Sequence, residues 1–306
     1  MNEDLALTPL EVAEILKITK NTVYELIKRD ELKAYKVGNK LRIDAKDVEE
    51  YKNSTKRSKV SNIQIEQKQE VQHNGFIISG QDIMLDIMVR HLEKNFNFHA
   101  FRSYEGSYNG IFQLYQGKVQ LATAHLWDGD TGVYNVPYVK RMLPGVPAVI
   151  VHLAKRMQGF YVAKGNPKNI QGFQDLKRSD ICIINREKGS GTRVLLDEHL
   201  RKLGIMGSKL KGYEKECSSH LGIASAVSRG EADIGMGNEK SGLQVKDIDF
   251  IPLQQENYDL IIKKEDFYKP YYQTVLQVIN SEDFRKELEG IGGYDLKDMG
   301  KIAGET

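Results

Sequence analysis

Hydroxyl and guanidinium side chains gather in one short segment near the middle of the chain, residues 185–193. An apolar run precedes this segment and an amphipathic helical pattern follows it to Leu200, which predicts a strand, a turn and a helix start in that order. A helix N-terminus leaves backbone N–H groups without partners and carries the positive end of the helix dipole. The segment therefore predicts an anion-binding site. Its candidate ligand-binding residues are Arg186, Ser190, Gly191, Thr192 and Arg193.

The two arginines of this segment favour a binding site over a purely structural turn. Ser190 could simply cap the helix, and the turn would then have no other role. Arg186 and Arg193 exceed what capping requires, and a guanidinium fork suits a planar or tetrahedral oxyanion. We therefore expect a small oxyanion as the ligand.

Polar or glycine-containing turns follow three other predicted strands, at residues 76–80, 99–102 and 119–124. The carboxyl ends of parallel strands share one edge of a sheet, and ligands commonly bind there. We therefore expect these turns to face the arginine-containing segment, together with a helix start near residue 219. His125 could instead be hydrogen-bonded in the cleft without contacting the ligand. The further candidate ligand-binding residues are Ser79, Gly80, Ser107, His125 and His220.

The elements that would position these residues form two α/β units after residue 75. Strands, turns and helices alternate in both units, which is typical of a parallel sheet. The later predicted strands are at residues 160–163, 181–184, 232–236, 250–253 and 258–262. The last two are expected to return the chain to the first unit. The predicted fold class is α/β, with a two-lobed domain over residues 75–306: lobe 1 is about 75–157 and 250–306, and lobe 2 is about 158–249.

The first 53 residues carry a different pattern. The motif T-P-L-E at residues 8–11 combines a capping threonine, a proline at the first helical position and the glutamate of a capping box. A second short helix is predicted from Thr19, and two short strands flank the hairpin signal G-N at residues 38–39. Two adjoining helices followed by a hairpin predict a winged helix-turn-helix over residues 1–53.

Basic residues outnumber acidic residues by eight to three between Lys17 and Arg42. Short polar side chains at a helix start can contact base edges, and lysines can neutralise phosphates. On charge alone, an ordinary solvated small domain would explain the pattern equally well. The candidate DNA-binding residues are Lys20, Asn21, Thr22, Tyr24 and Lys28 on the second helix and Lys36, Lys40 and Arg42 on the hairpin.

The order of residues in this region carries a family resemblance. Residues 7–51, beginning L-T-P-L-E-V-A-E-I-L-K-I-T-K-N-T-V-Y-E-L, closely resemble the excisionase-type winged-helix DNA-binding domains related to the MerR family. The resemblance implies that the second helix enters the major groove of double-stranded DNA and that the hairpin is the wing. It implies a position near bases for Lys20, Asn21, Thr22 and Tyr24, and near phosphates for Lys36, Lys40 and Arg42.

Several motifs after residue 75 carry a second resemblance. They are E-G-S-Y-N-G from Glu105, H-L-W-D-G-D-T-G from His125, N-R-E-K-G-S-G-T-R from Asn185, S-H-L-G-I-A from Ser219 and G-E-A-D-I-G-M-G from Gly230. Together they resemble the PBP-like domains, intracellular relatives of type II periplasmic binding proteins, which occur fused to DNA-binding domains and to molybdopterin-biosynthesis enzymes. The S-G-T segment is also locally similar to tungstate- and molybdate-binding proteins of ABC uptake systems, which implies molybdate or tungstate as the ligand.

Residues 54–74 are rich in lysine, serine and glutamine and are interpreted as a linker between the two parts. The segment could instead form a weakly amphipathic dimerisation helix, because residues 63–71 contain no helix breaker.

Composition and missing motifs limit the function classes. The 306 residues carry a net charge of +2, so a nucleic-acid site must come from local clustering. Cys182 and Cys217 are too few for a structural zinc site, and Cys182 is expected to be a buried thiol. We expect no metal site, no cofactor, no secretory signal and no membrane span, and therefore a cytoplasmic protein. Because G-x-S-x-G, G-x-x-x-x-G-K-[ST] and H-E-x-x-H are all absent from the sequence, we do not expect an enzyme.

These observations predict a ligand-responsive transcriptional regulator. Closure of two lobes on a small anion, molybdate or tungstate by resemblance, would change the arrangement of the DNA-binding domains in a homodimer. The alternative is a cytoplasmic carrier of molybdate or a molybdopterin precursor, or an accessory protein of cofactor biosynthesis.

Overall fold

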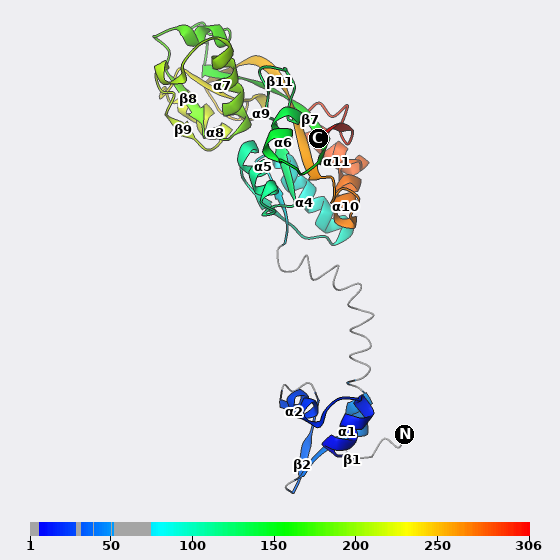
Figure 1. Cartoon of the computed structure of the whole chain (residues 1–306). Helices are drawn as coiled ribbons and strands as arrows, with labels where there is room; N and C mark the ends of the chain where they lie inside the picture. The colour runs from blue at the N-terminus through cyan, green and yellow to red at the C-terminus, as the bar shows by residue number, and fades with distance from the viewer. Residues whose placement is uncertain (1–5, 29–31, 39, 50, 52–74) are drawn as a thin grey trace. The chain divides into compact units, whose positions relative to one another are not determined.

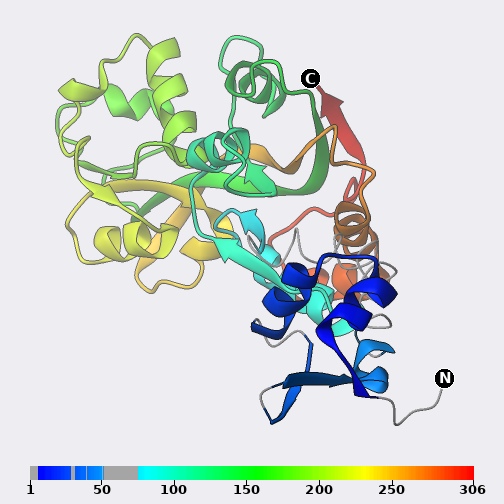
Figure 2. The ribbon, with the colours of Figure 1, turned by 60° about the horizontal axis from the view of Figure 1, so that its bottom comes forward.

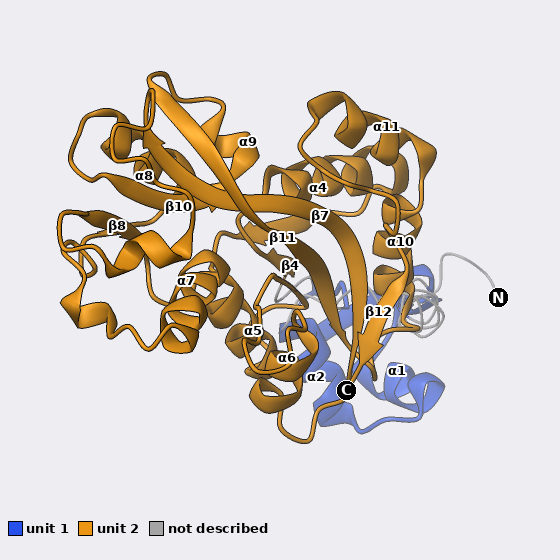
Figure 3. Cartoon of the chain, turned by 90° about the horizontal axis from the view of Figure 1, so that it is seen from above, with its two compact units in different colours: residues 1–74 blue, residues 75–306 orange. Residues whose placement is uncertain are grey.

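The chain divides into two compact units, residues 1–74 and residues 75–306, which Figure 3 shows in two colours. The structure is a computed structural model that describes residues 6–28, 32–38, 40–49, 51 and 75–306. The predicted linker at residues 54–74, and its alternative as a dimerisation helix, lie outside the described residues.

In the first unit, two short helices follow the strand β1 (Ala6–Leu7) at the positions that the sequence predicts. The N-cap of α1 (Pro9–Leu16) is Thr8, and the Thr8 backbone N–H donates a hydrogen bond to Glu11 Oε2 at 2.7 Å. The predicted capping box is therefore confirmed. Helix α2 (Lys20–Lys28) follows after three residues, which gives the proportions of a helix-turn-helix.

An antiparallel sheet completes the described part of the first unit. The strand order is β1-β3-β2, and residues 45–49 after the sheet are helical. Gly38, between β2 and β3, has a φ of 59°, a left-handed conformation that favours glycine. Buried side chains such as Val12, Val23 and Ile43 join the helices to the sheet. The strands are β1 (Ala6–Leu7), β2 (Tyr35–Val37) and β3 (Lys40–Asp44).

The first lobe of the second unit contains three parallel strands covered by helices on both faces. Along β7 (Ala148–Ala163), Val149 and Val151 pack with α4, α10 and α11, whereas Ala148 and Ile150 pack with α5 and α6. The three strands are β4 (Phe76–Ser79), β5 (Ala100–Ser103) and β6 (Leu121–Ala124). The helices are α4 (Ile83–Phe96), α5 (Ser107–Tyr115), α6 (Val136–Met142), α10 (Pro270–Ile279) and α11 (Glu282–Ile291).

The second lobe repeats this arrangement on a smaller scale, with β8 parallel to both β9 and β10. Cys182 forms an isolated bridge to Lys211 just before β8 and is half-buried, so the prediction of a buried thiol is wrong. The strands are β8 (Ile183–Arg186), β9 (Glu216–Cys217) and β10 (Ile234–Asn238). The helices are α7 (Gly191–Lys202), α8 (His220–Ser228), α9 (Glu239–Gly242) and the 3-10 turns η1 (Phe173–Lys177) and η2 (Gly207–Lys209).

Two long strands, β7 (Ala148–Ala163) and β11 (Ile248–Lys263), run through both lobes and pair antiparallel along their length. Strand β6 of the first lobe pairs with β11, and β10 of the second lobe pairs with β7. Figure 1 shows the two lobes joined in this way. The C-terminal β12 (Ile302–Glu305) lies along β7 (Figure 2).

These long strands correct the sequence prediction in two places. The predicted strand at 160–163 is only the end of β7, and the predicted strands at 250–253 and 258–262 are both parts of β11. The polar residues of 155–158 and 254–257 interrupt the apolar pattern, but the strands continue through them because each pairs with the other. The sheet is consequently mixed rather than parallel throughout. Among the described residues, no helix combines the length and apolar character needed to cross a membrane.

Candidate ligand-binding site

A cavity of about 540 Å³ lies between the two lobes of the second unit. Four of the residues that line it are N-caps of helices of at least nine residues. Asp82 of α4 and Gly106 of α5 belong to the first lobe, and Ser190 of α7 and Ser219 of α8 belong to the second. Helix N-termini carry partial positive charge and unpaired N–H groups, so this arrangement suits an anion.

The N-terminus of α5 differs from the other three because Gly106 has no side chain that could cap it. At α4, α7 and α8 the N-cap side chain accepts a hydrogen bond from a helix backbone N–H, at 2.8, 3.2 and 3.0 Å respectively. Helix α5 therefore has the N-terminus whose first N–H groups most need a partner from outside the helix.

The N-termini of α5 and α7 meet across the cavity. The backbone N–H of Tyr108 donates to the carbonyl oxygen of Gly189 at 2.9 Å, which joins the lobes directly. Gly191 packs against the imidazole of His125 so closely that an added Cβ would lie 2.7 Å from the ring. The sequence S-G-T places a glycine at this position, and only a glycine leaves room for the histidine.

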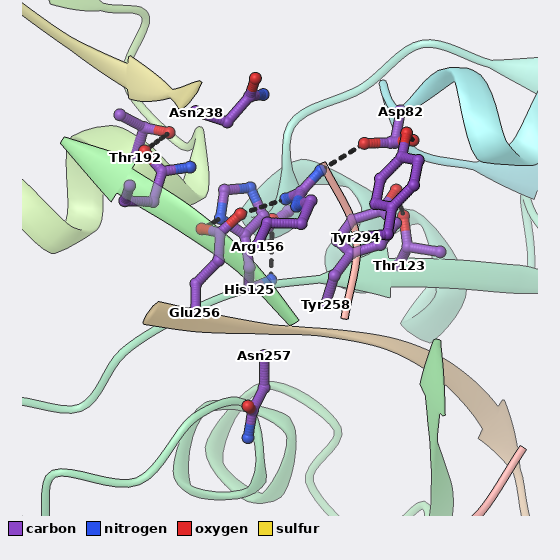
Figure 4. Close-up of polar contacts among 12 residues, drawn as sticks. Asp82, Thr123, His125, Arg156, Thr192, Asn238, Glu256, Asn257, Tyr258 and Tyr294 are labelled. Carbon is purple, nitrogen blue, oxygen red and sulfur yellow. Dashed lines mark hydrogen bonds and ion pairs between the residues drawn. The ribbon is translucent and has the colours of Figure 1, made fainter. Parts of the chain in front are cut away.

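A buried ion-pair network forms the floor of the cavity, where β7 and β11 cross between the lobes (Figure 4). Arg156 Nη1 lies 2.5 Å from Asp82 Oδ2, and Arg156 Nη2 lies 2.5 Å from Glu256 Oε1. The second carboxylate oxygen of Glu256 lies 2.6 Å from His125 Nδ1. Tyr294 donates its hydroxyl hydrogen to Asp82 Oδ1 at 2.6 Å. The network joins the shared strands to the first lobe.

Glu256 and Arg156 of this network both stay charged near neutral pH. Burial alone would raise the pKa of Glu256, but the positive charge of Arg156 and the contact with His125 hold that pKa down at about 2. Burial alone would lower the pKa of Arg156, and the facing Glu256 and Asp82 raise it. Both groups therefore remain ionised in the folded protein.

Seven of the ten predicted ligand-binding residues line the cavity, and three do not. Ser79 is buried beneath it, and its hydroxyl lacks a hydrogen-bond partner in the structure. Thr192 is also buried, and its hydroxyl is 3.5 Å from Gln158 Oε1. The third is Arg193. The seven lining residues are Gly80, Ser107, His125, Arg186, Ser190, Gly191 and His220.

The two arginines of the 185–193 segment have different surroundings. Arg186 lines the cavity, and its Nη2 donates to Gln81 Oε1 of the first lobe at 2.6 Å and to Glu187 Oε1 at 2.8 Å. Arg193 points away from the cavity and pairs with Asp197 and Glu216, at 3.0 and 3.2 Å. Its guanidinium also lies 4.2 Å from the ring centre of Tyr213. Arg186 therefore lies at the cavity while paired with Glu187, whereas Arg193 stabilises α7 through its two ion pairs.

His220 begins α8 and is neutral at physiological pH. Burial lowers its pKa well below the usual range, and the positive charges of Arg186 and Arg156 act in the same direction. Its Nδ1 is buried without a hydrogen-bond partner in the structure. The ring can therefore offer a neutral hydrogen-bonding group to the cavity.

The candidate DNA-binding residues form one exposed surface on α2 and one on the hairpin. The five residues on α2 and both hairpin lysines are exposed. Arg42 is half-buried and donates to the carbonyl oxygen of Leu41 at 3.0 Å. Lys20 Nζ lies 5.8 Å from the ring centre of Tyr24.

Sequence reasoning did not find several residues that line the cavity, notably Asp82, Arg156 and Lys240. The sequence does indicate a role for Arg156, because a charged residue inside a long apolar strand needs a buried partner. Asp82 is the N-cap of α4, and a capping residue has no signal in the sequence that distinguishes it as part of a cavity. Among the described residues, no cluster of three or more histidine, cysteine or acidic side chains could hold a metal ion.

Comparison with known proteins agrees with this architecture. The family model described as a PBP superfamily domain matches residues 89–280, and a helix-turn-helix domain model matches residues 6–56. A Bacillus subtilis (strain 168) protein named uncharacterized protein YvgK is 44% identical over 311 residues, which covers 100% of both chains. A Clostridium pasteurianum protein from the 5′ region of a 2Fe-2S ferredoxin gene is 58% identical over 112 residues, 37% of this chain and 99% of that one.

Two solved structures share the fold. A putative phosphate ABC transporter substrate-binding protein with bound phosphate, from Clostridium perfringens, has a TM-score of 0.52 at 16% identity and covers 72% of this chain and 98% of its own. A hydrogen peroxide-bound OxyR mutant from Corynebacterium glutamicum has a TM-score of 0.53 at 10% identity over 93% of this chain and 89% of its own. At these identities the likeness concerns the fold alone.

The combination of a helix-turn-helix domain with a two-lobed ligand-binding fold fits a ligand-responsive regulator. Since the PBP superfamily model matches well over half of the chain, this protein belongs to the PBP superfamily domain family and carries an N-terminal helix-turn-helix domain.

Proposed function

We propose that this chain is a transcriptional regulator that binds double-stranded DNA through its first unit and a small anion through its second. The observation that carries the proposal is the cavity between the lobes, which is lined by the N-caps of four helices. Backbone amides, serine hydroxyls and Arg186 would hold the anion there, since charge-assisted hydrogen bonds are the strong ones. A regulator of this kind acts where the chromosome is, so the proposal includes a cytoplasmic location.

The anion would act by changing the population of closed lobes. Contacts such as Tyr108 to Gly189 and Gln81 to Arg186 join the lobes in the closed arrangement. A ligand that touches both lobes binds this arrangement more tightly than an open one, and so shifts the equilibrium toward it. In a homodimer, the shift would alter the geometry of two DNA-binding units and hence operator affinity.

Molybdate and tungstate are the first ligands to test. The local similarity of the S-G-T segment to molybdate- and tungstate-binding proteins supports them, and both are tetrahedral oxyanions that hydroxyls, amides and an arginine can hold. Isothermal titration calorimetry of the full chain with molybdate, tungstate, sulfate and phosphate provides the test. We expect heat from the first two and a clear preference for them; no heat from either would refute the metal-oxyanion proposal.

DNA binding separates a regulator from a carrier or an accessory protein of cofactor biosynthesis. A regulator binds a specific operator upstream of its target genes and loses affinity steeply as salt increases. Gel-shift assays with upstream DNA, with and without the anion, therefore distinguish the functions. Anion binding without any specific DNA complex would favour a carrier, and turnover of molybdopterin intermediates would favour an accessory enzyme.

A further inference from the structure

Lys240 differs from the other cations that line the cavity because it has no carboxylate partner. Arg156 pairs with Asp82 and Glu256, each at 2.5 Å, and Arg186 pairs with Glu187 at 2.8 Å. Within the described part of the chain, no acidic oxygen comes within ion-pair distance of Lys240 Nζ. Among the described residues that line the cavity, Lys240 is therefore a cation without an ion-pair partner.

The ammonium group of Lys240 is also buried without a hydrogen-bond partner in the structure. It lies 4.3 Å from the ring centre of Tyr294, a cation–π contact that satisfies none of its three N–H donors by a conventional acceptor. Burial lowers its pKa, while nearby Asp82 acts in the opposite direction. Native proteins rarely leave a buried charged donor unpaired, so this one needs an explanation.

Two more nitrogen atoms in the cavity lining share this property. Arg156 Nε and His220 Nδ1 are buried and have no hydrogen-bond partner in the structure. The Arg156 side chain is 6% exposed, and each of its two Nη atoms lies 2.5 Å from a carboxylate oxygen. Lys240, Arg156 and His220 all line the cavity, and each carries a buried nitrogen atom without a partner in the structure, so the cavity suits a ligand with several hydrogen-bonding atoms.

We propose that Lys240 is the ligand-binding cation of the cavity, kept without a counter-ion in the protein so that a bound oxyanion supplies it. This assignment rests on the proposed function, in which the cavity takes an anion. Lys240 follows β10 of the second lobe, and Tyr294 follows α11 of the first. An oxyanion held by Lys240 therefore lies where the lobes meet and stabilises their closed arrangement.

The alternative is a structural role, in which Lys240 joins the lobes through the ring of Tyr294. The two roles predict opposite effects on the stability of the ligand-free protein. A structural lysine stabilises it, whereas an uncompensated buried ammonium destabilises it, so that replacing the charge raises stability. Functional sites commonly retain groups of this kind at the expense of stability.

The test compares the full-length wild type with Lys240→Gln and with Lys246→Gln as a matched control. Lys246 is an exposed lysine of the same lobe that does not line the cavity, so its replacement removes the same charge elsewhere. Calorimetric titrations use molybdate, tungstate, sulfate and phosphate, and urea unfolding is measured without added oxyanion. We expect wild type and K246Q to bind the preferred oxyanion equally, and K240Q to bind it at least tenfold more weakly. We also expect the urea midpoint of K240Q to be higher than that of the wild type.

The outcomes separate this assignment from the proposed function. If K240Q binds the preferred oxyanion as tightly as wild type does, the assignment of Lys240 is wrong and the proposed function stands. If none of the four oxyanions binds to the wild type, the proposed oxyanion ligand fails, and the urea midpoints decide about Lys240. A K240Q midpoint at or below that of the wild type then overturns the assignment, and a higher midpoint supports an uncompensated cation.

Discussion

Arg156 and Glu256 lie directly opposite each other on β7 and β11, with 2.5 Å between the guanidinium Nη2 and the carboxylate Oε1. The side chains are 6% and 0% exposed. The pair stands at the point where the two strands pass from one lobe to the other, and irregular pairing of β11 occurs at 252–254 and 258–259 on either side of it. The lobes are therefore joined around a buried charge pair rather than an apolar contact.

Replacement of Arg156 by methionine should strongly destabilise the protein. The variant leaves the buried carboxylates of Asp82 and Glu256 without their shared cation, which typically costs about 3–5 kcal/mol. Urea unfolding measures the change. Arg178→Gln serves as the control, because Arg178 forms a partly exposed pair with Asp180, and the variant should lose roughly 1 kcal/mol or less. Equal effects of the two variants would contradict the importance of the buried network.

The ionised Glu256 should make stability depend on pH in the acidic range. Its pKa in the folded protein is about 2, against an ordinary value of 4.5. Because the folded pKa is the lower one, the stabilisation is complete above about pH 4.5 and is lost as pH falls through 2. The contribution is on the order of 3 kcal/mol. Unfolding measured at several values from pH 5 to pH 2 should show a shallower decline for Glu256→Gln, and an unchanged decline would contradict the assignment.

Gly191→Ala should disturb the contact between α7 and His125. An added Cβ would lie 2.7 Å from the imidazole, so the ring or the helix must shift. Overpacking of this kind costs roughly 1–3 kcal/mol, and we also expect weaker anion binding because the lobes close less well. A double-mutant cycle with His125→Ala should show that the two changes are coupled. Gly290→Ala, where nothing lies within 4 Å of the added Cβ, is the matched control.

Replacement of Arg186 should weaken anion binding, whereas replacement of Arg193 should lower the stability of the fold. Arg186→Gln should weaken anion binding about tenfold, because a charge-assisted hydrogen bond to the ligand is lost. Arg193→Met should leave the affinity of the folded protein unchanged and reduce its stability by roughly 2–4 kcal/mol, since Asp197 and Glu216 lose their cation. Calorimetry and urea unfolding of both variants provide the measurements. If Arg193→Met instead weakens anion binding and Arg186→Gln only lowers stability, Arg193 is the arginine that contacts the ligand.

Variants of α2 and of the hairpin should distinguish contacts to DNA bases from contacts to DNA phosphates. Asn21→Ala on α2 should reduce operator affinity about tenfold or more and relax sequence preference, as expected when a base contact is lost. Lys36→Gln on the hairpin should weaken binding to all sequences alike. It should also reduce the slope of log affinity against log salt concentration by about one. Fluorescence anisotropy at several salt concentrations distinguishes the two. Lys286→Gln, in a helix of the second unit, is a control that should change neither quantity.

The sequence alone predicts the features that depend on neighbouring residues. The capping box joins Thr8 to Glu11, three residues away, and the structure confirms it. Ser190 likewise caps α7 through the backbone N–H of Arg193. Alternation of strands and helices also predicts the two-lobed α/β domain, and two adjoining helices followed by a hairpin predict the helix-turn-helix domain. Such patterns are visible in a sequence because hydrogen bonds at helix ends and the periodicity of apolar residues are local properties.

Tertiary structure alone decides which charged residues face the ligand cavity. Arg186 and Arg193 have the same chemistry and stand seven residues apart, but one meets Gln81 of the other lobe and the other meets Tyr213 and Glu216. Arg156 and Glu256 meet because β7 and β11, far apart in the chain, pair along their length. Lys240 comes from α9, which follows β10, and β10 pairs with β7. A local pattern contains no information about such pairing, since the partner of each buried charge is set by strand register and lobe closure.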